Sequence, residues 1–176
     1  MDIVERAQIK NTLLRCAQVC GGVTGKFAKR LCPDDTIIRE MMEDGELRRI
    51  PVEVKMSDRT TKKMYFYEDS TKQKQANFPN MKEEDAKRIS ILNNCFCTYY
   101  EESQWLKKSD VKRLVSMSDV SDSKLMPDLM FYNNNQLIAV YVRKNYAKLT
   151  DEEKTKIESN LTVDKVIEYL YQEVFI

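Results

Sequence analysis

The sequence predicts an α+β fold built in two parts. Residues 1–68 hold three segments with apolar residues at helical spacing, followed by two strand-like runs, and residues 82–176 mix helical segments with a strong β-hairpin signal. The intervening residues 69–81 are polar, contain Pro79 and are predicted to form a linker. A content of 42% hydrophobic and 32% charged residues among 176 is typical of a soluble globular protein with modest cores.

The composition argues against an enzyme and against a cofactor. The chain contains no His, which removes Ser-His and Cys-His nucleophiles and the commonest metal ligand. The sequence shows neither an apolar leader nor a run of residues apolar enough to span a membrane, so we expect a cytoplasmic protein. Its five Cys, an odd number, are then predicted to be free thiols. A zinc site would need a fourth ligand beside Cys16, Cys20 and Cys32, so we expect no metal.

The first part is predicted to contain three capped helices. Side chains that accept hydrogen bonds from backbone N–H groups stand before each apolar stretch, and Gly follows the first and third. We therefore expect helices at residues 3–19 after Asp2, at residues 25–31 after Thr24, and from Asp34 or Asp35 up to Gly45.

Two strand-like runs, residues 47–54 and 64–67, flank the basic segment 55–63 directly after the third helix. A short turn joins the second and third helices, which is typical of a helix-turn-helix. The basic segment between strands is then a wing. The first part resembles bacterial winged helix-turn-helix domains.

Such a domain binds duplex DNA when its presented elements carry positive charge. The predicted third helix, however, bears five acids against the lone Arg39, and this favours the alternative of a protein-docking winged helix. The predicted DNA-binding residues are Lys26, Lys29, Arg30, Arg39, Arg48, Arg49, Lys55, Arg59, Lys62 and Lys63.

The second part is predicted to be a small α/β lobe. Its strongest signal is a hairpin of residues 125–132 and 136–144 joined by three Asn. Further expected elements are a helix from Lys82, with 95–100 as its end or a strand, and helices at 109–115, from Thr150 and at 162–172, with a last strand at 173–176.

The hairpin resembles the PD-(D/E)xK nuclease layout. Pro127 and Asp128 open its first strand, but Tyr141 and Arg143 stand where the resemblance expects a carboxylate and a Lys. One carboxylate binds Mg²⁺ weakly, and Arg does not lose its proton. We therefore predict no nuclease activity, with Asp128, Tyr141 and Arg143 as vestigial positions. Two alternatives are a plain turn at Pro127 and a migrated carboxylate from Glu101, Glu102 or Asp122.

A winged helix followed by a PD-(D/E)xK-like lobe resembles the replication-relaxation family. That resemblance implies a DNA-associated accessory protein of a plasmid, phage or integrative element. The leading prediction is a non-catalytic DNA-binding accessory or regulatory protein that binds double-stranded DNA, with a homodimer or a partner from a replication or mobilisation complex. The alternatives are a protein-interaction adaptor or inhibitor and a Mg²⁺-dependent nuclease.

Overall fold

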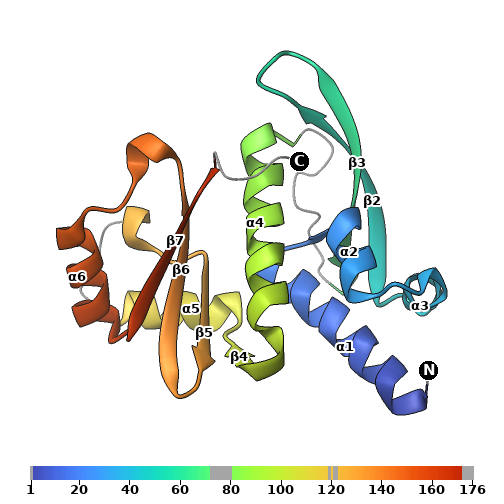
Figure 1. The fold of residues 1–176 in the computed structure, drawn as a ribbon, viewed down its shortest axis with the longest axis horizontal. Helices are drawn as coiled ribbons and strands as arrows, with labels where there is room; N and C mark the ends of the chain where they lie inside the picture. The colour runs from blue at the N-terminus through green and yellow to red at the C-terminus, as the bar shows by residue number, and fades with distance from the viewer. Residues whose placement is uncertain (1, 72–80, 119, 121–122, 172–176) are drawn as a thin grey trace. The chain divides into compact units, whose positions relative to one another are not determined.

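The computed structural model describes residues 2–71, 81–118, 120 and 123–171. It confirms the α+β class, with helices and two separate sheets. The chain forms two compact units, one reaching Cys97 and the other starting at Thr98 (Figure 1). Within the described residues, every helix is too short or too polar to traverse a lipid bilayer.

The three predicted helices of the first unit are confirmed together with their caps. The carboxylate of Asp2 accepts from Glu5 N, the hydroxyl of Thr24 from Phe27 N, and the carboxylate of Asp34 from Thr36 N. These bonds satisfy backbone donors that a helix leaves unpaired. The helices are α1 (Ile3–Cys20), α2 (Gly25–Leu31) and α3 (Asp35–Glu43).

An antiparallel sheet of three strands accompanies these helices. β3 (Thr61–Asp69) lies between β1 (Val23–Thr24) and β2 (Leu47–Lys55), so the two predicted strands are confirmed and extended. Lys55 pairs with Thr61, which places residues 62 and 63 inside β3. The tip of the β2–β3 hairpin is therefore only residues 56–60, with Arg59 at φ 70°.

Helix α4 (Glu83–Tyr99) packs on the sheet of the first unit. It buries Ala86 in one cluster with Val52, Val54 and Phe66. The sequence pattern predicts that residues from 82 onward belong to the second part, whereas the boundary between the compact units falls at Cys97. Of the two alternatives for residues 95–100, the end of the helix is observed rather than a strand. Residues 72–80 of the predicted linker lie outside the described residues.

The fully buried side chain of Asn93 fastens α4 to the turn after α1. Its amide nitrogen donates to the carbonyl of Gly22 at 2.9 Å, and its oxygen accepts from Thr24 N at 3.0 Å. Both backbone groups belong to the segment that connects α1 with α2. One side chain thus satisfies two buried polar groups on a neighbouring element.

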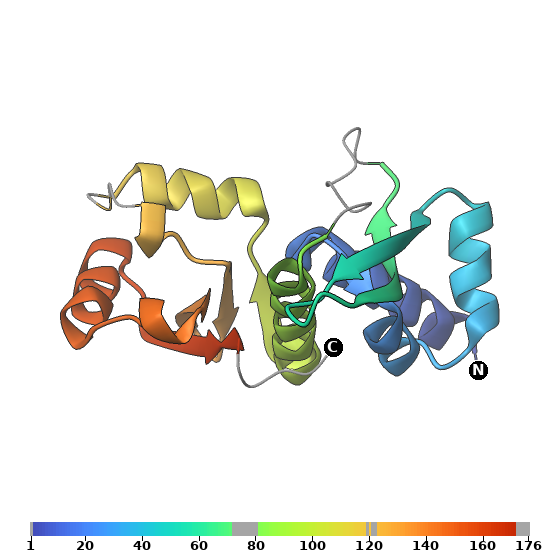
Figure 2. The ribbon, with the colours of Figure 1, turned by 90° about the horizontal axis from the view of Figure 1, so that it is seen from above.

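The second unit contains a four-stranded sheet covered by two helices. The strands are β4 (Ser103–Trp105), β5 (Leu129–Asn133), β6 (Gln136–Arg143) and β7 (Lys165–Leu170), in that spatial order. β7 runs parallel to β6, and α6 (Asp151–Leu161) lies between them in sequence. Side chains of α5 (Lys108–Ser116) and α6 share one core with one face of this sheet (Figure 2).

The predicted β5–β6 hairpin and the helix after Thr150 are confirmed. Asn134 and Asn135 adopt φ 48° and φ 62°, the left-handed pair that a tight two-residue hairpin turn requires. The predicted helix at 162–172 is wrong, because β7 occupies residues 165–170. Thr162, at φ 53°, ends α6, and the apolar spacing that follows suits a strand as well as a helix. The predicted strand at 173–176 lies outside the described residues.

We expect Asn93→Ala to destabilise the first unit by about 2–4 kcal/mol, because two buried backbone groups lose their partner. Urea unfolding followed by circular dichroism measures this change. Asn94→Ala, at the exposed neighbouring position, is the matched control and is expected to have little effect. Equal losses for the two variants would contradict the role given to Asn93.

Candidate functional site

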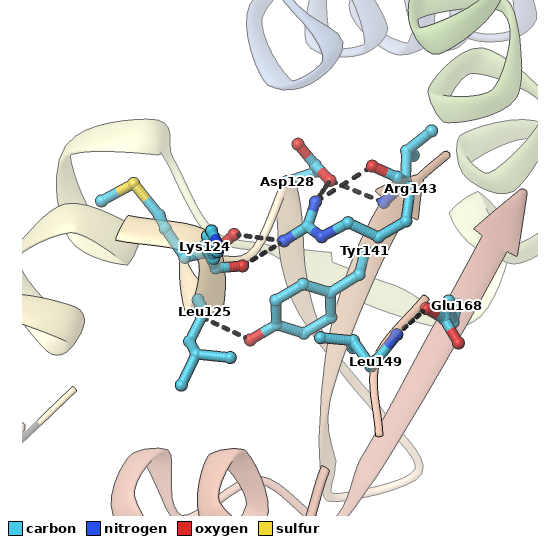
Figure 3. Close-up of polar contacts among 9 residues, drawn as sticks. Lys124, Leu125, Asp128, Tyr141, Arg143, Leu149 and Glu168 are labelled. Carbon is cyan, nitrogen blue, oxygen red and sulfur yellow. Dashed lines mark hydrogen bonds and ion pairs between the residues drawn. The ribbon is translucent and has the colours of Figure 1, made fainter. Parts of the chain in front are cut away.

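The three residues that the sequence predicts to be vestigial nuclease positions come together in the second unit. Asp128 lies immediately before β5, and Tyr141 and Arg143 project from β6 (Figure 3). Arg143 Nη1 donates to Asp128 Oδ2 at 3.1 Å, and Val142 N donates to the same oxygen at 2.6 Å. The carboxylate is therefore held by a side chain and by the strand backbone.

The guanidinium of Arg143 lies among oxygen atoms. Besides Asp128, it donates to the carbonyls of Val142 at 3.0 Å, Lys124 at 2.7 Å and Met126 at 3.3 Å (Figure 3). Only 17% of its side chain and 5% of that of Asp128 are exposed. A carboxylate and three carbonyls form an oxygen-rich site that suits a cation, and here the cation is supplied by the chain.

Tyr141 has a structural role beside the Asp128–Arg143 pair. Its ring is fully buried beneath the guanidinium, whose central carbon lies 4.9 Å from the ring centroid. Its hydroxyl donates to the carbonyl of Leu125 at 2.8 Å. Burial raises the pKa of Tyr141 far above its usual value, so the phenol stays protonated. The side chain is then neither a base nor an anionic ligand.

Glu168 is a buried carboxylate that no sequence pattern singled out. It lies on β7 opposite Tyr141, and its side chain is 7% exposed. One oxygen accepts from Leu149 N at 2.6 Å (Figure 3). The other lies 3.6 Å from the ammonium of Lys154. Because residues 162–172 were expected to be helical, the pairing of Glu168 with β6 could not be anticipated. Both oxygens of Glu168 therefore have partners within the second unit.

The other carboxylates considered for a migrated site are placed differently. Glu101 and Glu102 lie exposed in a short 3-10 helix, Tyr100–Glu102. Asp122 lies outside the described residues. Within the described part of the chain, no cluster of three His, Cys, Asp or Glu side chains could hold a metal ion.

The thiols gather in the first unit without forming a metal site among the described residues. Cys16 and Cys20 lie on one face of α1 with their sulfur atoms 4.0 Å apart. Burial raises the pKa of the Cys16 thiol, and it raises that of Cys97 to about 11. Cys32 is also buried, and burial raises its pKa. Such thiols stay protonated and behave as core residues.

The predicted DNA-binding residues lie on several elements of the first unit. Exposed ones occupy α2 (Lys26, Lys29 and Arg30), α3 (Arg39) and the β2–β3 hairpin (Arg49, Lys55, Arg59, Lys62 and Lys63). Arg48 differs from these, because it pairs with the buried carboxylate of Glu68 and is thereby tied to the sheet. Arg30 also donates to the side chain of Asn94 at 3.3 Å.

The acids of α3 are largely paired with cations of neighbouring helices. Glu40 contacts Arg6 and Lys10 of α1, and Lys10 also lies 3.6 Å from Asp44. The hydrogen bond from Arg6 is the main cause that lowers the pKa of Glu40. Asp34 is occupied as the helix cap. Two of the five acids that the sequence assigned to this helix, Glu40 and Asp44, are thus paired with cations of α1.

The tip of the β2–β3 hairpin is anchored to α4. Ser57 N donates to one oxygen of Glu83 at 2.6 Å, and Lys87 lies 2.8 Å from the other. The Lys87 hydrogen bond, followed by that from Ser57, lowers the pKa of Glu83 to about 2. Lys55 N also donates to the carbonyl of Met81. Several bonds therefore fix the direction of the hairpin relative to α4.

No protein-family model matches this chain, and neither a curated protein nor a solved structure does so significantly. The class of protein is therefore inferred from the residues of the chain itself. Two features carry that inference, namely the basic β2–β3 hairpin of the first unit and the Asp128–Arg143 pair of the second.

Removal of the guanidinium is expected to destabilise the second unit. Arg143→Met leaves the buried Asp128 carboxylate without its cation, which costs about 3 kcal/mol. Adding Asp128→Asn should recover part of that loss, because no buried charge then remains. Chemical denaturation of the single and double variants measures both effects. Arg113→Met, at a 72% exposed arginine that also faces a carboxylate, is the control. A loss no larger than that of Arg113→Met would contradict this account.

Acid is expected to weaken the anchor of the hairpin. Because the pKa of Glu83 falls from 4.5 to about 2 on folding, its contribution is complete above pH 4.5 and is lost as pH falls toward 2. The stability difference between the wild type and Glu83→Gln should therefore shrink over that interval. Urea midpoints measured across this pH range test it, with the exposed Glu84→Gln as control. A difference independent of pH would refute the anchor.

Proposed function

We propose that this protein is a non-catalytic DNA-binding accessory or regulatory protein, of the kind that plasmids, phages and integrative elements encode. The first unit would be a winged helix-turn-helix that contacts double-stranded DNA. The second would be a degenerate PD-(D/E)xK lobe that serves dimerisation or the docking of a replication or mobilisation partner. The observation that carries the proposal is the exposed basic charge on the β2–β3 hairpin.

The order of elements in the first unit supports a winged helix. Three helices are followed by an antiparallel hairpin, and residues 32–34 form the short connection between α2 and α3. A short strand before α2 pairs with β3 and completes the sheet. This is the arrangement in which a third helix and a wing are presented together.

The charge distribution supports contact with phosphates. The hairpin carries exposed Lys55, Arg59, Lys62 and Lys63 within nine residues. The acids Glu40 and Asp44 of α3 are paired with α1, which reduces the repulsion that a polyanion would meet there. Phosphate contacts supply most sequence-independent affinity for DNA.

The Asp128–Arg143 pair supports a non-catalytic second unit. In a metal-dependent nuclease, carboxylates hold the ion that activates water. Here the Asp128 carboxylate is bound to a guanidinium, and the Tyr141 phenol beside it stays protonated. After β4, this unit continues with α5, the β5–β6 hairpin, α6 and β7, a mixture of helices and strands compatible with the α/β lobe that the resemblance to such nucleases implies.

A DNA titration tests the proposal. Fluorescence anisotropy of a labelled duplex should show affinity that falls steeply with salt. A triple variant with Lys55, Arg59 and Lys63 changed to Gln should bind more weakly at every salt concentration. Its slope of log affinity against log salt should be smaller by about 0.9 for each phosphate that the variant no longer neutralises. The same duplex incubated with Mg²⁺ should remain intact.

The matched control is a triple variant of the second unit, in which the exposed Lys148, Lys156 and Lys165 are changed to Gln. It removes the same net charge at a distance in sequence from the hairpin and should bind the duplex like the wild type. If both triple variants bound DNA equally weakly, the affinity would depend on the net charge of the protein and not on the hairpin, which would contradict the proposal. No binding even at low salt would refute the proposal and favour the protein-docking alternative.

A further inference from the structure

The outer face of the β2–β3 hairpin carries a half-exposed aromatic ring in the middle of a strand. Tyr65 is 52% exposed, whereas its neighbour Phe66 points to the opposite face and is fully buried. The guanidinium carbon of Arg49 lies 4.8 Å from the centroid of the Tyr65 ring. A tyrosine ring and a stacked guanidinium thus form a planar, positively charged platform.

The rest of this face adds charge along the strand. Side chains alternate between the two faces of a strand, so Lys63 of β3 and Lys55 of β2 lie on the same face as Tyr65 and Arg49. Glu53, opposite Lys63, is an exposed acid on this face, whereas Asp69 at the far end of β3 is buried. The exposed cations near the platform therefore outnumber the exposed acid.

The pairing of β1 with β3 ends next to the platform. β1 pairs with β3 only at Phe66 and Tyr67, so Tyr65 lies just past the third strand. The first residue of α2, Gly25, packs against the backbone of Tyr65, where an added Cβ would lie 3.5 Å from its carbonyl oxygen. The backbone of the platform is thus supported, while the ring extends toward solvent.

We propose that the Tyr65–Arg49 platform binds unpaired bases of single-stranded DNA. This inference rests on the proposed function and specifies the nucleic acid that the outer face of the hairpin takes. Bases within a duplex are stacked on one another and offer only their edges. An exposed ring face beside cations suits a base that has left the stack, with its phosphates held by Lys63 and Lys55. The hairpin tip would contact duplex phosphates next to such a segment.

The test compares two labelled probes by fluorescence anisotropy at equal salt: oligodeoxythymidylate of about 20 nucleotides and a blunt duplex of the same length. Tyr65→Leu should weaken binding of the single strand about tenfold and leave duplex binding nearly unchanged, because it removes a stacking surface and no charge. Tyr65→Phe keeps the ring and should bind the single strand like the wild type.

Two further variants sharpen the test. Tyr146→Leu removes another exposed tyrosine that lies beside a lysine, 85% exposed and 5.6 Å from Lys144 Nζ, and should change neither affinity. Tyr65→Trp introduces an exposed indole in addition to the single native tryptophan, Trp105, whose side chain is only 6% exposed. Oligodeoxythymidylate should quench the fluorescence of this variant, because a base stacked on the indole shortens its excited state.

The outcomes separate this inference from the proposed function. Duplex binding without single-strand binding overturns the platform alone, and so does equal loss of both affinities in Tyr65→Leu. A Tyr65→Phe variant as weak as Tyr65→Leu would assign the contact to the hydroxyl and overturn stacking. If the protein binds neither the single strand nor the duplex, the proposed function is overturned together with this inference.

Discussion

The buried amide of Asn93 joins α4 to the segment between α1 and α2, and the geometry of the first unit follows from that connection. With α4 fixed there, its first turn meets the hairpin tip through Glu83 and Ser57. The helices and the hairpin are thereby set relative to one another by bonds from the first turn of α4 and from Asn93 in its second half. A polar group buried without partners is costly, so these contacts specify one arrangement and do more than add stability.

The fold of the first unit also determines which of its charged side chains are paired and which are exposed. Glu40 of α3 and Asp44 at its end pair with cations on α1, and Arg48 pairs with the buried Glu68. Arg49, Lys55, Arg59, Lys62 and Lys63 of the β2–β3 hairpin remain exposed at the surface. A chain with a net charge of +1 thus obtains a locally positive surface through the way it pairs its acids. Composition alone gives no indication of this distribution.

Local signals in the sequence predicted the local structure well. The caps Asp2, Thr24 and Asp34 and the Asn turn of the β5–β6 hairpin depend on residues close in the chain, and each is observed. What failed depends on distant partners. The apolar spacing after Thr162 fits helix and strand equally, and only the parallel pairing with β6 decides between them. The same holds for three other features: the packing of α4 on the first unit, the pairing of Glu40 with α1, and the hydrogen bond of Glu168 to Leu149. Each depends on residues far apart in the sequence, which a short sequence pattern does not contain.

The cation at Asp128 is covalently part of the chain, and this has a consequence for how the site responds to its surroundings. A bound ion leaves at a rate and to an extent set by its concentration, whereas a side chain two residues from Tyr141 is present at a very high effective concentration. The pairing of Asp128 with Arg143 therefore depends on the folding of the second unit and not on the concentration of a free ion. The carbonyls of Lys124 and Met126 accept hydrogen bonds from the same guanidinium, so the segment before β5 is tied to the end of β6 by that one side chain. The second unit thus carries the counter-cation of Asp128 within its own fold.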